Sequence, residues 1–185
     1  MFKLLPLLSL SLLLLLSGCG SKKYYTLGNT INVQSTTTYT KEIDVVRVNV
    51  PKYLRDHTLV RQVSPYQVEI IDKAQWLTPM QKHLTNVLID YLQKSMNNPN
   101  IHLYPWNAGK NTAKRVSVTI KRFIAYNNEV ILEANYKIEN LEKKISTTKL
   151  FHTTVESNHN IDNMMASMEK AYFELAEKIK MEVLE

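Results

Sequence analysis

Residues 116–138 constrain the fold most strongly, because apolar side chains recur at every second position in two runs along this segment. Such a period of two is typical of strands that bury one face and leave the other in water. Asn127-Asn128 separates the runs, and asparagine tolerates the left-handed conformation that a tight hairpin turn requires. Phe123 breaks the even-numbered phase, which predicts a bulge near Lys121-Arg122. The chain is therefore expected to contain an antiparallel hairpin with one buried face.

Other segments have the composition and alternation of shorter strands. The sequence predicts them at residues 24–27, 43–50, 59–63, 66–71, 101–104 and 145–155. Ser64-Pro65 separates two of these strands and predicts a turn between them, so this pair is expected to form a second hairpin. Pro51 ends the strand at 43–50, and residues 140–144 form the turn before the last strand.

Two segments place apolar residues at helical spacing. Thr78-Pro79 predicts the start of the first helix, because threonine is a good N-cap and proline fits the first helical position. Its apolar stripe covers residues 80–96, and Asn97-Asn98-Pro99 ends it. Asn160 is the predicted cap of the second helix, whose apolar face covers residues 161–183. We interpret the methionines on the first stripe as core packing rather than as an adaptable ligand groove.

The order of these elements predicts the fold class. Strands come first, then a helix, a three-stranded meander and a second helix. Each helix and each strand has one face to bury, and packing both helices on one face of a sheet satisfies all of them. We therefore expect an α+β fold with one mostly antiparallel sheet and two helices on one of its faces. The other sheet face and the sheet edges would remain for a partner.

The N-terminal segment predicts an exported chain. After Lys3, residues 4–16 form a run of thirteen uncharged residues, ten of them leucine. This run is shorter than the roughly 20 apolar residues that a membrane-spanning helix needs, and it fits the apolar region of a cleavable signal. Leu16-Ser17-Gly18-Cys19 places small residues before the only cysteine and resembles the bacterial lipobox. We expect the Cys19 thiol to receive a diacylglycerol, although an ordinary secretory signal or a buried free thiol is the alternative.

These features divide the chain into three parts. We expect a lipoprotein signal peptide at residues 1–18, a lipidated tether at 19–23 and a single α+β domain at 24–185. The residue after Cys19 is Gly20. The sorting rule of bacterial lipoproteins, in which aspartate here favours the inner membrane, therefore implies the periplasmic face of the outer membrane. The five steps from Cys19 to Tyr24 span at most roughly 17 Å, which would keep the domain close to the bilayer.

Composition argues against several classes of function. The chain has four glycines, and no P-loop or dinucleotide-binding fingerprint can be written with them. Its five histidines form neither a helical pair nor a cluster with metal-site spacing, so we interpret them as surface or turn residues. No serine lies in a nucleophile elbow. We therefore expect no cofactor, no metal and no enzymatic activity. The formal net charge of +6 favours anionic lipid headgroups over nucleic acid in an exported chain, or simply reflects solvated lysines.

Scattered residues along the chain carry a family resemblance. They are the lipobox, Tyr24-Tyr25-Thr26-Leu27, residues 46–50 with Pro51, Tyr53-Leu54, Leu59-Val60, Trp76 before Pro79, Phe123 and residues 130–136. In this respect the chain resembles the auxiliary lipoproteins of ABC-type intermembrane transport, among them the PqiC-like lipoproteins. The family usually has an acidic residue directly before the proline, where this chain has Thr78. The resemblance therefore does not indicate whether this chain makes any partner contact that the acidic residue makes in the family.

The resemblance implies a docking role in lipid traffic between two membranes. Such a lipoprotein would hold the outer-membrane end of a tube formed by a periplasmic protein with mammalian-cell-entry (MCE) domains. That tube leads to an inner-membrane ABC permease and ATPase. Several copies of the lipoprotein are candidates to form a homo-oligomeric ring. We expect Tyr104 and Trp106 to supply an exposed aromatic contact, and Trp76 to be a core residue. The alternatives are an assembly or pilot lipoprotein for another outer-membrane complex, and a periplasmic hydrolase using Asp44, His57 and Asp72.

Overall fold

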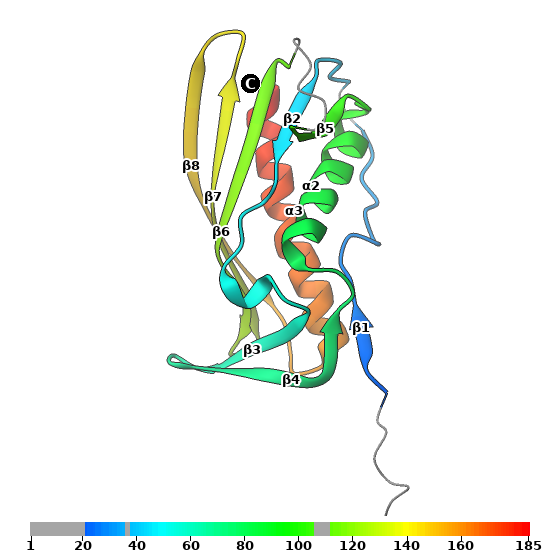
Figure 1. Ribbon diagram of the computed structural model, residues 1–185, viewed down its shortest axis with the longest axis vertical. Helices are drawn as coiled ribbons and strands as arrows, with labels where there is room; N and C mark the ends of the chain where they lie inside the picture. Colours follow the sequence, from blue (N-terminus) through cyan, green and yellow to red (C-terminus); the bar gives the residue numbers. More distant parts are fainter. Residues whose placement is uncertain (1–20, 36–37, 106–111) are drawn as a thin grey trace, which may run out of the picture.

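Two sheets and two long helices make up the described part of the chain in this computed structural model, which comprises residues 21–35, 38–105 and 112–185 (Figure 1). In chain order the elements are β1 (Lys23–Tyr25), β2 (Ile43–Val46), a short 3-10 helix (Lys52–Leu54), β3 (Thr58–Ser64), β4 (Gln67–Trp76), α2 (Met80–Met96), β5 (Ile101–Tyr104), β6 (Lys114–Tyr126), β7 (Glu129–Asn140), β8 (Ile145–Glu156) and α3 (Ile161–Leu184).

The larger sheet has five strands in the order β5-β2-β6-β7-β8, and the smaller has three in the order β1-β4-β3. In the larger sheet β6, β7 and β8 form an antiparallel meander, while β2 runs parallel to both β5 and β6. In the smaller sheet β3 and β4 are antiparallel and β1 is parallel to β4. The α+β class is confirmed, but the strands divide between two mixed sheets instead of forming one. Periodicity shows which face of a strand is buried, and it carries no information on the partner or direction of that strand.

The hairpin of β6 and β7 has the predicted geometry. Asn127 and Asn128 have φ angles of 48° and 62°, which is the left-handed conformation of a tight turn. The pairing register shifts between Ile120 and Arg122, so the predicted bulge is confirmed. The β3–β4 hairpin is confirmed as well. These features depend on neighbouring residues, which explains why the sequence predicts them well.

The strand predicted at residues 43–50 is shorter than expected. β2 ends at Val46, and only Asn49 makes a further bridge, to Thr119 in β6. The backbone N–H of Val48 instead donates to the Thr85 hydroxyl at 3.0 Å. This bond ties the segment to α2 and ends its regular pairing, although Val48 and Val50 remain buried.

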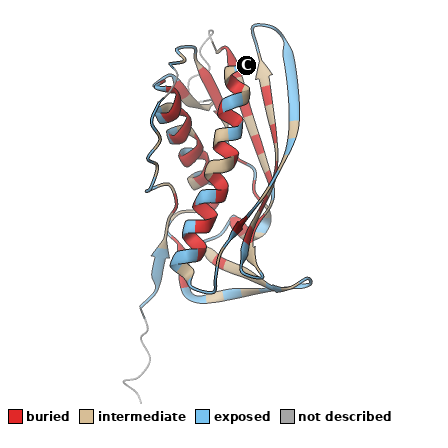
Figure 2. Cartoon of the chain, turned by 180° about the vertical axis from the view of Figure 1, so that it is seen from behind, coloured by how far each residue is buried: buried red, intermediate tan, exposed pale blue. Residues whose placement is uncertain are grey.

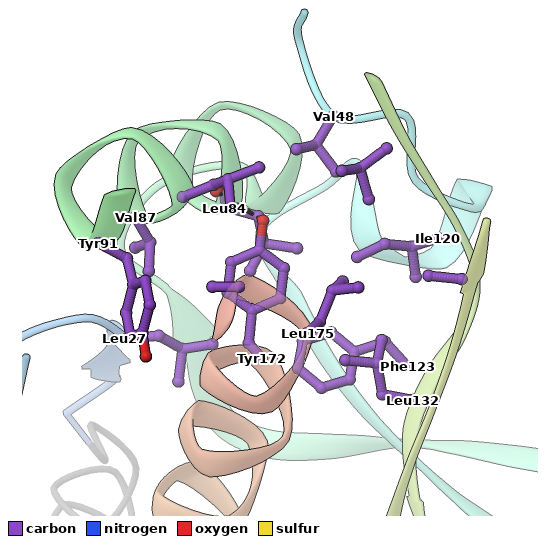
Figure 3. Packing of buried hydrophobic residues seen from close by; sticks show 14 of the residues in the cluster. Leu27, Val48, Leu84, Val87, Tyr91, Ile120, Phe123, Leu132, Tyr172 and Leu175 are labelled. Atoms are coloured by element: carbon purple, nitrogen blue, oxygen red, sulfur yellow. Dashed lines mark hydrogen bonds between the residues drawn. The ribbon is translucent and has the colours of Figure 1, made fainter. Parts of the chain in front are cut away.

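Both helices cover the same face of the larger sheet, as predicted (Figure 1). Their buried sides face each other and the strands, and their exposed sides face outward (Figure 2). Tyr172 of α3 donates its hydroxyl hydrogen to the Leu84 carbonyl of α2 at 2.8 Å and stacks near Phe123 of β6 at 6.3 Å between ring centroids (Figure 3). One hydrophobic cluster thus joins both helices to the sheet.

The helix ends agree with the sequence in two of the three predicted cases. The Asn160 side chain caps α3 by accepting from the N–H groups of Asp162 and Asn163 at 2.8 and 3.3 Å. Asn97, with φ of 45°, ends α2 as expected. The predicted Thr78 cap is wrong, because α2 begins at Met80 and Pro79 takes the cap position without a side-chain hydrogen bond. No helix in the described ranges is long and apolar enough to cross a membrane.

Candidate docking surfaces

Tyr104 lies half-buried at the end of β5, an edge strand of the larger sheet. The guanidinium carbon of Arg115, in β6, lies 4.0 Å from the centroid of the Tyr104 ring, within range of a cation–π contact. The contact with Arg115 therefore fixes the Tyr104 ring on one side, while part of the ring remains accessible to solvent. Trp106, the second predicted contact, lies outside the described residues, as does Cys19.

A buried carboxylate in β2 completes this cluster. Asp44 is 1% exposed, and its Oδ2 lies 3.4 Å from Nη2 of Arg115. Within the described part of the chain, Asp44 Oδ1 and Arg115 Nε have no hydrogen-bond partner, and neither has Oε1 of nearby Glu42. Buried polar atoms are normally paired, because leaving one unpaired costs roughly 1–3 kcal/mol. The β5 side of the sheet therefore keeps unused hydrogen-bonding capacity beside an aromatic ring.

The opposite edge of the larger sheet is β8, which pairs with β7 along all twelve of its residues. No strand in the described ranges pairs with its outer side. Lys149 and Thr153 point toward α3, where they contact Glu182 and Glu174, so the alternate residues face away from the helices. Leu150, on that outer face, is 83% exposed. The free outer edge of a strand of this length offers a row of main-chain donors and acceptors to an incoming strand.

β1 is the edge of the smaller sheet and spans only three residues. The segment that follows it is tightly fixed: Nε2 of His83, in α2, lies 2.9 Å from both the nitrogen and the oxygen of Leu27. Glu169 of α3 accepts from the Gly28 N–H and from the Thr30 hydroxyl. The first folded residues are therefore held by both helices.

Gly28 and His83 have structural roles that sequence analysis missed. Gly28 has a φ of 87°, and a Cβ added there would lie 2.7 Å from a methyl carbon of Val87. His83 is half-buried, which differs from the surface or turn position expected for histidines. Burial lowers its pKa, against the opposing effect of the hydrogen bond to the Leu27 carbonyl. In the sequence, the only signal was the position of His83 beside the apolar stripe of its helix.

Two of the three residues of the hydrolase alternative make structural contacts, and the third lies in a different sheet from Asp44. Asp44 is ion-paired with Arg115, and Nδ1 of His57 lies 2.7 Å from the Trp76 carbonyl oxygen. Asp72 is exposed on β4, in the other sheet from Asp44. Trp76 itself is 1% exposed, as predicted for a core residue. Among the described residues, no group of three or more histidine, cysteine, aspartate or glutamate side chains could hold a metal ion.

Comparison with known proteins gives a family match and a shared fold. The sequence model of the family described as ABC-type transport auxiliary lipoprotein component matches residues 25–180. No curated protein matches the chain. One crystal structure, of an uncharacterized protein, superposes with a TM-score of 0.73 at 20% identity, over 89% of this chain and 99% of the other. The structure of XCC0632 from Xanthomonas campestris, of family DUF330, superposes at 0.71 with 12% identity, over 85% and 92%. At these identities the two structures support the fold alone.

Proposed function

Because the chain belongs to the family of ABC-type transport auxiliary lipoprotein components, we propose that it is an accessory subunit of an intermembrane lipid transport system. It is anchored through acylated Cys19 on the periplasmic face of the outer membrane, and it docks a periplasmic MCE-domain protein there. Through that protein it is connected to an inner-membrane ABC permease and ATPase. Its role is binding and positioning, without catalysis.

The unpaired outer side of β8 is the observation that carries the docking role. Strand addition supplies affinity through main-chain hydrogen bonds, and exposed side chains such as Leu150 add selectivity. β1, the edge of the smaller sheet, has three residues and offers far fewer main-chain bonds. The β8 edge is therefore the preferred docking strand.

The cluster of Tyr104, Arg115 and Asp44 is a second proposed contact, together with Trp106. Aromatic and arginine side chains are enriched in protein interfaces, and the side chains of Tyr104 and Arg115 are partly exposed at this edge. The two contacts lie on opposite edges of the larger sheet. Such an arrangement suits a homo-oligomeric ring, in which each copy presents one edge to a neighbour and leaves another surface for the tube.

The test is binding between the purified full-length lipoprotein and the periplasmic part of an MCE protein encoded nearby, without ATP. Adjacent residues of an antiparallel strand direct their N–H groups to opposite sides. Of Leu150→Pro and Phe151→Pro, one therefore breaks pairing with β7 and the other removes an outward donor. We expect the variant that loses only the outward N–H group to keep its melting temperature. It should bind the MCE protein at least about tenfold more weakly, a difference of roughly 1.4 kcal/mol in binding free energy.

Tyr24→Pro in β1 is the control, and it should leave MCE binding unchanged. If the wild-type protein does not bind the MCE protein, and its deletion leaves the lipid permeability of the outer membrane unchanged, the transport function is rejected. The alternative, an assembly or pilot lipoprotein for another outer-membrane complex, then takes its place.

A further inference from the structure

The β3–β4 hairpin exposes a group of apolar side chains that the proposed function does not use. They are Val63, Tyr66, Val68 and Ile70, which are 41%, 99%, 51% and 66% exposed. Single exposed apolar residues are normal on protein surfaces, whereas several on one hairpin indicate a contact with something else. Val68 pairs with Gln62 and Ile70 with Val60, which places both apolar side chains on the same face of the hairpin.

This face points away from the body of the protein. The alternate residues of β4, Glu69 and Ile71, line a cavity of about 220 Å³ between the hairpin, the β6–β7 turn and the start of α3. Because successive side chains of a strand point to opposite faces, Val68 and Ile70 must face outward from that cavity. In Figure 1 the hairpin crosses the lower end of the molecule with the rest of the fold above it.

The chain leaves the fold toward the membrane anchor at this same end. β1 pairs in parallel with the last residues of β4, beginning with Lys23 opposite Ala74, so the tether starts beside the base of the hairpin (Figure 1). Lys73, with φ of 59°, separates the protruding part of β4 from the part that pairs with β1. The four steps from Cys19 to Lys23 span at most about 14 Å. An acyl chain on Cys19 would thus hold the hairpin near the bilayer.

The side chains around the hairpin suit a lipid headgroup region. Tyr66 and Tyr24 combine an apolar ring with a polar hydroxyl, a combination favoured at membrane interfaces. Lys22, Lys23, Arg55 and Lys73 are exposed near the hairpin base, where Asp56 and Asp72 are the exposed acids. This excess of basic side chains is complementary to anionic headgroups.

We propose that the apolar face of the β3–β4 hairpin, formed by Tyr66, Val68 and Ile70, rests in the headgroup region of the membrane that holds the lipid anchor. The proposal depends on the acylation of Cys19 stated in the proposed function. It makes the hairpin a second membrane contact whose role is orientation. A lipid anchor alone fixes one point, and the domain could still tilt about it.

Two contacts fix the direction of the long axis. With the hairpin flat on the membrane, the long axis stands upright, and the β7–β8 turn and the C-terminus lie at the far end (Figure 1). β8 runs along this axis, so its unpaired edge would extend away from the membrane into the periplasm. That is the direction from which a tube bridging the two membranes would arrive.

Fluorescence of the full-length, acylated protein in vesicles of phosphatidylethanolamine and phosphatidylglycerol tests the proposal. Cys19 is the only cysteine and is consumed by acylation, so Ile70→Cys and Tyr66→Cys each provide one thiol for an environment-sensitive dye. Ile145→Cys is the matched control, because Ile145 is 58% exposed and lies at the far end of the molecule. We expect the dyes at 66 and 70 to shift to the blue, to resist iodide and to be quenched by nitroxide-labelled lipid.

The dye at 145 should remain open to iodide and unaffected by nitroxide lipid. If the protein floats with the vesicles but the dyes at 66, 70 and 145 behave alike, the hairpin contact is rejected. The lipid anchor is not affected by that result. Protection from iodide without quenching by nitroxide lipid would mean that a protein surface, such as a second copy, covers the hairpin, and would also overturn the hairpin contact. Protein that does not float with the vesicles lacks the anchor, which rejects the anchored function and this proposal together. MCE binding plays no part in the measurement.

Discussion

At the residue scale, a few side chains determine where the folded chain begins. His83 and Glu169 hold the backbone of residues 27–28 from two different helices, and Gly28 allows the close approach to Val87. Each of these contacts joins residues that are far apart in sequence. A polar helix residue such as His83 therefore becomes a structural residue only through the strand that docks against it.

The burial of His83 makes stability depend on pH. Burial lowers the pKa of His83, so below its unfolded pKa of about 6.5 the unfolded chain binds a proton more readily than the folded chain does. The stabilisation is thus fully present above about pH 6.5 and is lost as the pH falls through that value toward the folded pKa. We expect urea unfolding to give a smaller free energy at about pH 5.5 than at about pH 7.5.

His83→Gln removes the titrating group and should reduce this pH dependence. The other four histidines are unchanged in the variant, so the difference between the two proteins reports on His83. An equal loss of stability on acidification in both proteins would show that the proton-sensitive contact lies elsewhere.

At the element scale, the apolar face of α3 organises the core. The helix contacts β6, β7 and β8 on one side and α2 on the other. Its buried residues follow the pattern expected from the sequence, and Leu175 is fully buried beside Phe123 and Leu132 (Figure 3). The same helix also carries Met181 on its outer side, where it is 45% exposed. Substitutions on the buried face and on the exposed face of this helix can therefore be compared directly for their effect on stability.

Leu175→Asp should unfold the protein. A lone carboxylate buried among apolar side chains, together with the lost packing, costs several kcal/mol, against a total stability of roughly 5–15 kcal/mol. Met181→Asp on the exposed face is the control and should cost less than about 1 kcal/mol. Thermal melts followed by circular dichroism measure both. A Leu175→Asp protein that melts like the wild type would place this face outside the core.

At the scale of the whole molecule, the proposed attachment point and the start of the proposed docking strand β8 lie at opposite ends (Figure 1). β1 and the β3–β4 hairpin lie at one end, and the C-terminus lies at the other (Figure 1). The two sheets have different places in this arrangement. The smaller sheet lies beside the tether, and the larger sheet carries both proposed docking edges. This separation lets one end remain at a membrane while the rest of the molecule receives a partner.

Cys19→Ser should abolish membrane attachment while the domain still folds. Oxygen is a poor substitute for the thiolate in diacylglycerol transfer, and three acyl chains make an anchor that is effectively permanent. Labelled palmitate should enter the wild-type protein only, and the variant should no longer fractionate with membranes. Equal labelling of both proteins would reject the lipoprotein assignment of this cysteine.

Local features of the fold could be predicted because neighbouring residues decide them. The left-handed turn at Asn127-Asn128, the bulge after Ile120 and the Asn160 cap each depend on contacts within a few positions. Thr78 is the exception, because the helix starts one residue later than its cap signal indicates. The burial of Trp76 and of the two helix stripes also followed from composition and spacing.

The docking surfaces were predicted only in outline. Tyr104 was predicted as an aromatic contact, but its proximity to Arg115 and Asp44 was not, because nothing in the sequence indicates that β2 lies between β5 and β6. The sequence did not indicate which strands are edges, and the structure shows that β1 and β8 are among them. Only the tertiary structure shows that these two strands differ in length and that one face of the β3–β4 hairpin protrudes.

The sequence by itself determined the element types, their buried faces, the tight turn and the predicted lipid attachment, since each depends on residue chemistry at short range. Only the tertiary structure decided that the strands form two sheets, that β2 is parallel to its neighbours, and that the hairpin lies beside the tether. Strand pairing joins residues distant along the chain through main-chain groups that every residue possesses. Side-chain patterns therefore reveal that a strand will pair, but not which strand it will find.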